Sequence, residues 1–117
     1  MYGVIKVGER DVPMLATAAT PIRYRQVFKK NLLPYFMGKA TEEDAAEMVG
    51  ELAYIMAAAA SAEGSMKLTE DGYLSWLEGF DPLAFVDPIV VREIINLYQG
   101  NVTSHEEVKK NQGRPNG

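Results

Sequence analysis

Apolar and polar residues alternate along the first seventeen positions, which is the pattern of strands with one buried face. Residues 1–7 form a first run, Gly8-Glu-Arg-Asp11 is typical of a turn, and residues 12–17 form a second run. Pro13 lacks an N–H and therefore prefers the edge of a sheet. An isolated hairpin is marginally stable, so we expect residues 1–17 to pack on the helices that follow.

The pattern then changes to the helical period, beginning at Thr20-Pro21. Proline favours an extended conformation at Thr20, so we expect Thr20 to be the N-cap and Pro21 the first helical residue. Pro34 is expected to end or kink this helix just after Asn31 or Leu32. At about 100° per residue, one apolar stripe contains Tyr24, Phe28, Leu32, Tyr35 and Phe36.

Three further helices are predicted in residues 41–99. The first covers about residues 42–62 after a Thr41 cap, and its solvent face carries Glu43, Asp44, Glu47 and Glu51. A short helix begins at Thr69, and a final one runs from Pro88 to about Tyr98 after the Asp87 cap. The predicted fold class is therefore α+β and mainly α, with an N-terminal β-hairpin packed on a bundle of about four helices. Residues 1–100 are expected to form one globular domain, and residues 101–117 a polar, disordered tail.

Charge is distributed unevenly along the 117 residues. Residues 1–40 carry seven Lys/Arg and two Asp/Glu, whereas residues 41–100 carry two and twelve. Such a dipolar molecule is suited to self-association or to different partners on different faces. The absence of cysteine excludes disulfides and Cys-ligated zinc. An intracellular setting suits a chain that folds without cross-links, and composition alone leaves the compartment open. No apolar run is long enough for a membrane span and no signal peptide is visible, so no membrane contact is expected.

No residue cluster resembles a catalytic site. The single histidine, His105, falls in the polar tail, and no glycine-rich phosphate loop is present. The carboxylates of residues 42–51 are predicted to face water in a row, whereas an acid–base or metal site needs carboxylates that converge from several elements. We therefore expect no catalytic residue, no metal and no cofactor, and a protein that is not an enzyme.

Two groups of residues are candidates for binding a partner. The first helix is basic and aromatic, and Arg25 and Lys29 repel each other one turn apart, which leaves them available to an acidic protein or to the acidic helix of a second copy. Nucleic acid is a less favoured partner, because the pI is about 5.0 and no basic stripe crosses a face. Trp76 and Phe80 are either a core aromatic cluster, which is favoured, or a binding hot spot. The complete candidate set is Arg23, Tyr24, Arg25, Lys29, Lys30, Trp76 and Phe80.

The segment Ala-Ala-Thr-Pro-Ile-Arg-Tyr-Arg (residues 18–25) resembles the tail assembly chaperones of long-tailed (siphovirus-type) phages and prophages of Gram-positive bacteria. The likeness extends over most of the chain through the order and spacing of residues 5–10, 51–56, 76–82 and 95–98.

This resemblance implies a non-enzymatic protein of the bacterial host's cytoplasm, absent from the mature virion, that coats the tape measure protein before the tail tube assembles. Family members often have a longer form, made by ribosomal frameshifting, that recruits the major tail (tube) protein. Lys109-Lys110-Asn111 is compatible with a slippery run of adenines. The alternatives are a structural or adaptor protein of the phage particle and, less favoured, a small helical DNA-binding regulator.

Overall fold

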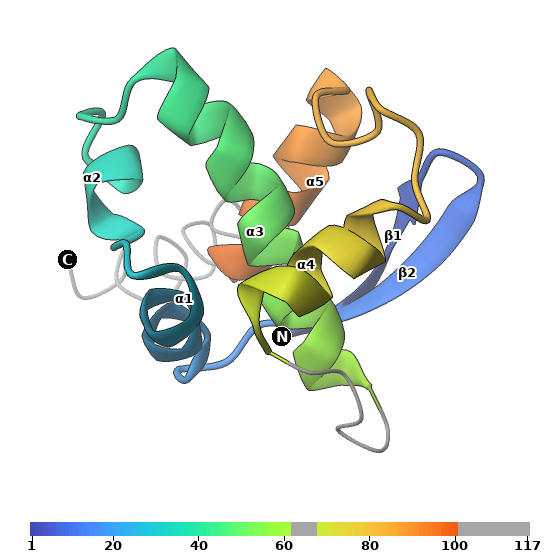
Figure 1. Cartoon of the computed structure of the whole chain (residues 1–117), viewed down its shortest axis with the longest axis horizontal. Coiled ribbons are helices and arrows are strands. Elements are labelled where there is room, and N and C mark those ends of the chain that lie inside the picture. The colour runs from blue at the N-terminus through green and yellow to red at the C-terminus, as the bar shows by residue number, and fades with distance from the viewer. Residues whose placement is uncertain (62–67, 101–117) are drawn as a thin grey trace, which may run out of the picture.

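A two-stranded antiparallel hairpin packs against a mainly helical body, as the sequence predicts (Figure 1). The structure, a computed structural model, describes residues 1–61 and 68–100. Helix α3 runs through the middle, with α1 and α2 on one side and the hairpin on the other (Figure 1). The elements are β1 (Tyr2–Val7), β2 (Arg10–Leu15), α1 (Thr20–Phe28), α2 (Leu33–Phe36), α3 (Glu42–Ala60), α4 (Glu70–Leu77) and α5 (Pro88–Tyr98).

The hairpin turns more tightly than the sequence suggests. Only Gly8 and Glu9 lie between the strands, whereas the predicted turn also included Arg10 and Asp11, which belong to β2. Gly8 has a φ of 64°, a conformation that glycine adopts without a steric penalty. The alternation itself is confirmed, because the inner face of the hairpin is buried against α3 and α5 and consists of Ile5, Val7, Val12 and Met14.

Helix α3 is the centre of the core. It begins after Thr41, whose hydroxyl accepts a hydrogen bond from the Asp44 N–H at 3.1 Å and so confirms the predicted cap. Every residue from Met48 to Ala58 is buried. The burial is this continuous because β2, α1, α4 and α5 all pack on the same helix.

The start of α1 differs from the prediction. The N-cap is Ala19, which makes no side-chain cap, and Thr20 is the first helical residue. The Thr20 hydroxyl instead accepts a hydrogen bond from the Thr17 N–H at 2.9 Å, and Thr20 is only 1% exposed. The threonine therefore closes the turn that precedes the helix, and it does so from within the core.

The end of α1 also differs, because Pro34 does not terminate it. Lys29 adopts a left-handed conformation (φ 59°, ψ 29°), and its N–H donates to the Arg25 carbonyl, so α1 stops at Phe28. Pro34 lies in the first turn of α2, where its missing N–H leaves no hydrogen bond unmade. Tyr35 and Phe36 consequently belong to a separate short helix and not to the stripe of α1.

The remaining caps follow the sequence. The Thr69 hydroxyl accepts from the Gly72 N–H at 2.9 Å and starts α4, and Asp87 accepts from the Ile89 N–H at 2.9 Å and starts α5. Arg10 joins the hairpin turn to the end of α4, since it donates to the Gly79 carbonyl and lies 4.4 Å from the centre of the Phe80 ring. Among the helices described, none is long and apolar enough to cross a membrane. The predicted tail, including His105 and residues 109–111, lies outside the described residues.

Candidate protein-binding site

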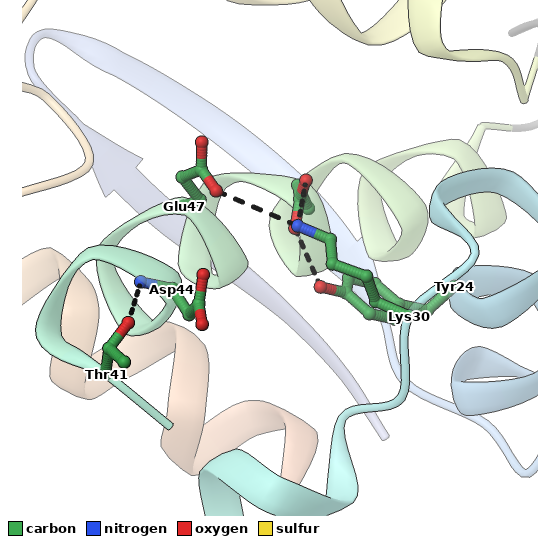
Figure 2. Close-up of polar contacts among 6 residues, drawn as sticks. Tyr24, Lys30, Thr41, Asp44 and Glu47 are labelled. Atoms are coloured by element: carbon green, nitrogen blue, oxygen red, sulfur yellow. Dashed lines mark hydrogen bonds and ion pairs between the residues drawn. The ribbon is translucent and has the colours of Figure 1, made fainter. Parts of the chain in front are cut away.

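A buried carboxylate joins α1 to α3. Glu51 of α3 is 7% exposed, and its Oε1 accepts a hydrogen bond from the Tyr24 hydroxyl at 2.7 Å. Its Oε2 accepts from Lys30 Nζ at 3.0 Å, and the same ammonium group lies 3.9 Å from Glu47. Figure 2 shows the Tyr24 ring and the Lys30 chain converging on α3, with Glu47 beside them. The prediction that Glu51 lies on the solvent face with Glu47 was wrong.

The position of Lys30 follows from the left-handed Lys29. Because α1 ends there, Lys30 leaves the helix and its side chain extends toward α3. Its side chain stays 41% exposed while that of Glu51 is 10% exposed, so the pair is only partly screened by water. Buried carboxylates need compensating donors, and Glu51 has one for each oxygen.

The phenol groups around this carboxylate are held neutral. Burial raises the pKa of Tyr24 well above its usual value of 10.0, and the hydrogen bond to Glu51 and its negative charge raise it further. Burial and the charges of Glu51 and Glu47 raise the pKa of Tyr73 in the same direction. Tyr73 lies this close to α3 because Gly50 has no Cβ; a Cβ there would be 2.6 Å from the Tyr73 hydroxyl oxygen.

Two depressions of about 310 Å³ each flank the short helix α2. We call the first the α1–α2–α5 groove; it is mainly apolar and is lined by Pro21, Ile22, Arg25, Asn31, Leu32, Leu33, Phe36 and Tyr98. Two of the lining residues, Phe36 and Tyr98, stack with their ring centres 5.3 Å apart. The second, the α2–α3 groove, has more charged residues in its lining, which consists of Tyr24, Lys30, Asn31, Pro34, Tyr35, Lys39, Ala40, Asp44 and Met48.

Large apolar side chains are exposed beside these grooves. Leu33 is 65% exposed, Met37 55% and Ile22 48%, and we call these three residues the α2 ridge. An apolar group of this kind, next to a groove, is typical of a protein-binding surface. Arg25 is the one charged residue in the lining of the α1–α2–α5 groove, whereas the α2–α3 groove is lined by Lys30, Lys39 and Asp44. Residues 12–41, which include the α2 ridge, contain five Lys/Arg and no Asp/Glu.

The structure separates the predicted basic residues of α1. Arg25 lines the α1–α2–α5 groove, whereas Arg23 lines a different depression next to the last turn of α3. Lys29 is exposed, and its Nζ donates to the Gln26 carbonyl at 2.9 Å. Tyr24 is 1% exposed and Lys30 is bound to Glu51, so these two stabilise the α1–α3 contact. Of the predicted residues of this segment, Arg23, Arg25 and Lys29 are exposed and are not used in the α1–α3 contact.

Trp76 and Phe80 are half-buried members of an aromatic cluster. Their ring centres are 4.9 Å apart, and both rings contact Phe85. The structure connects them to the other candidate group, because successive ring contacts of 4.9–5.6 Å lead from Phe80 through α4 to α1. The rings in this series are Phe80, Trp76, Tyr54, Tyr73, Phe28 and Tyr24.

Sequence reasoning missed the burial of Glu51 and the exposure of Leu33 and Met37. A signal for Glu51 was present, because it lies in an otherwise apolar run, Met-Val-Gly-Glu-Leu-Ala-Tyr-Ile-Met (residues 48–56). The predicted apolar stripe of Tyr24, Phe28, Leu32, Tyr35 and Phe36 did not include the residues of the α2 ridge, but nothing in the sequence marked those three as a group. Within the described part of the chain, no three His, Cys, Asp or Glu side chains converge as metal ligands would.

Comparison with known proteins found no match: no family model, no curated protein and no solved structure matches this chain. The surface and its charges are therefore the basis for a functional proposal.

Proposed function

We propose that this protein is a non-enzymatic tail assembly chaperone that binds and solubilises the tape measure protein of a long-tailed phage in the cytoplasm of its bacterial host. The observation that carries the proposal is the α2 ridge, where Ile22, Leu33 and Met37 are exposed beside an apolar groove and next to exposed cations. The resemblance of residues 18–25 and of the segments that follow supplies the identity of the partner.

The chemistry of this face suits an amphipathic helix. Such a helix binds by placing its apolar side chains, spaced three or four residues apart, into a groove of its receptor. The α1–α2–α5 groove offers Leu32, Phe36 and Tyr98 for those side chains. Arg25 at the wall and Lys29 nearby would pair with acidic residues along the edge of the bound helix.

A second property needed by a chaperone is a surface that keeps the complex in solution. Glu42, Glu43 and Asp44 are all exposed in the first turn of α3. They follow directly on the basic segment of residues 12–41, and Asp44 lines the α2–α3 groove with Lys30 and Lys39. Glu42 and Glu43 line neither groove, so a partner bound in the α1–α2–α5 groove would leave their negative charge in water, which opposes aggregation. Recruitment of the major tail protein by a longer, frameshifted form remains part of the proposal.

The proposal is tested by co-expressing the chain with the tape measure protein of the same genome and purifying the complex. We expect a soluble complex with several chaperone chains per tape measure chain. The double variant R25E/K29E should lose at least tenfold in recovered tape measure protein with unchanged helix content, because both charges that face the partner are reversed. The matched control is R92E, which reverses an exposed charge on α5.

A tape measure protein that remains insoluble while this chain elutes alone would refute the chaperone function. Equal recovery with R25E/K29E and with R92E would instead exclude the α1 cations from the contact. Mass spectrometry of purified phage particles distinguishes a chaperone from a structural protein, because only the latter stays in the particle.

A further inference from the structure

The hydrogen-bond register of the hairpin determines which backbone groups of β1 point away from β2. Met1 and Ala16 exchange a reciprocal pair of bonds, N to O in both directions. In an antiparallel ladder such pairs alternate with pairs that exchange none. Tyr2, Val4 and Lys6 are therefore non-bonded positions, and their N–H and C=O groups point outward from the sheet.

In the described part of the chain, no further strand pairs with this outer edge of β1, and α5 packs on the same strand. In the described part of the structure, the outward backbone groups of Tyr2, Val4 and Lys6 make no hydrogen bond to another element. The side chains of these residues lie on the outer face of the hairpin, where Tyr2 is 60% exposed and Val4 55%. An exposed strand edge with apolar side chains is a template for the addition of another strand.

The edge of β2 is different. Pro13 is opposite Val4, so it occupies a non-bonded position whose N–H would point outward. Proline has no N–H, and the β2 edge therefore lacks the donor at its centre. Addition of β1 of one molecule to β2 of another, which would propagate into a filament, is disfavoured for this reason. Only the β1 edge can accept a strand along its whole length.

We propose that a second copy of this chain adds through β1, antiparallel to the first, to form a closed dimer with a four-stranded sheet of order β2-β1-β1-β2. The twofold axis passes between the two Val4 residues. Tyr2 of each copy then lies opposite Lys6 of the other, and all six outward-pointing residues are used. Such an interface is isologous and closes after two subunits.

Side-chain pairing on the outer face agrees with this register. Within one hairpin Tyr2 is opposite Leu15, and Lys6 is opposite Asp11. In the dimer, neighbouring side chains across the four strands would be Leu15 and Tyr2 of one copy, followed by Lys6 and Asp11 of the other. The Lys6 cation then lies between the Tyr2 ring of the other copy and the carboxylate of its own Asp11. Shifting the register by two residues in each chain toward the turn would place Lys6 against Lys6, which is unfavourable.

The first test is the molar mass of the purified full chain by light scattering over micromolar to millimolar concentrations, alone and as two proline variants. The wild type should have twice the chain mass of 12.9 kDa. V4P should be monomeric, because it removes an outward N–H that the hairpin does not use. The matched control D11P removes an outward N–H from β2 together with the carboxylate beside Lys6, and it should weaken the dimer much less than V4P does. Circular dichroism verifies that both variants fold.

The second test uses charge at the axis and does not depend on proline. V4E and V4K should each be monomeric, because each would place two like charges opposite one another. An equimolar mixture of the two should recover a heterodimer, since the charges are then opposite. Dimer formation is measured without tape measure protein, so its outcome is independent of the proposed function.

A monomeric wild type over the whole concentration range would overturn the proposal. So would a V4P variant that remains dimeric, a D11P variant that dissociates as far as V4P, or a V4E and V4K mixture that stays monomeric. Masses that grow beyond the dimer would show that the interface is not closed and would refute the β1–β1 arrangement.

Discussion

Replacing Tyr24 with phenylalanine removes one oxygen from the middle of the α1–α3 contact and leaves the ring in place. The Glu51 carboxylate then keeps Lys30 as a donor but loses the 2.7 Å hydrogen bond from the phenol, while remaining 7% exposed. A hydrogen bond to a charged group contributes about 1.5–3 kcal/mol, so we expect the free energy of unfolding to fall by that amount. At about 4 °C per kcal/mol for a domain of this size, the midpoint of thermal unfolding should fall by roughly 6–12 °C.

The origin of this loss is tested by a double-mutant cycle with Glu51→Met. Without the carboxylate, the Tyr24 hydroxyl has lost its hydrogen-bond acceptor, so Y24F should be nearly neutral in that background. The coupling free energy between the two positions should therefore be at least about 1 kcal/mol. The matched control is Y35F, because Tyr35 is half-buried and its hydroxyl makes no hydrogen bond in the described structure; its effect should stay within about 0.5 kcal/mol.

Urea unfolding followed by circular dichroism and by the fluorescence of Trp76, the only tryptophan, measures each free energy. A loss below about 0.5 kcal/mol for Y24F would mean that the buried carboxylate does not depend on the phenol. An equal loss in the wild-type and Glu51→Met backgrounds would show that the effect arises from packing and not from the hydrogen bond.

Two further predictions concern the tyrosines that surround α3. G50A should lower the free energy of unfolding by up to about 2 kcal/mol, because overpacking against the Tyr73 hydroxyl exceeds the gain in helix propensity. In a Y73F background the same change should become neutral or stabilising. A G50A variant that stabilises the wild-type protein would contradict the contact between residue 50 and Tyr73. Burial raises the pKa values of Tyr24, Tyr73, Tyr54 and Tyr98 above 10.0, so the unfolded chain loses these protons first. Stability should therefore be independent of these groups below about pH 10 and should fall above it, by up to about 1.4 kcal/mol per pH unit for each buried tyrosine. Y73F should make the urea midpoint less sensitive to alkaline pH. An equal dependence of the urea midpoint on pH in the wild type and in Y73F would contradict the role of Tyr73.

Local signals predicted most of the elements. The caps at Thr41, Thr69 and Asp87 each make the hydrogen bond that their residue types favour. The alternation of residues 1–17 predicted which face of the hairpin is buried. These features depend on residues within a few positions of one another, so they can be inferred without knowledge of the rest of the fold.

The wrong predictions have two causes. Some depend on contacts between residues distant in sequence, and others on a local backbone conformation that competes with the expected one. Glu51 is buried because Tyr24, 27 residues earlier, and Lys30 both donate to it. Helical periodicity placed the glutamate with its acidic neighbours and contained no information about donors from another helix. Pro34 did not end α1 because Lys29 had already adopted a left-handed conformation, which is uncommon for residues other than glycine.

The features of the candidate binding face also fall into those that the local sequence determines and those that depend on tertiary packing. Sequence by itself determined that residues 12–41 are basic and free of acidic side chains, and that Pro13 weakens a strand edge. Only the tertiary structure decided that Lys30 is used internally, that Leu33 and Met37 are exposed, and that Arg25 lines a groove with Tyr98 of α5. The physical reason is that composition and caps act through the local chain, whereas burial and the walls of a groove depend on which distant elements pack together.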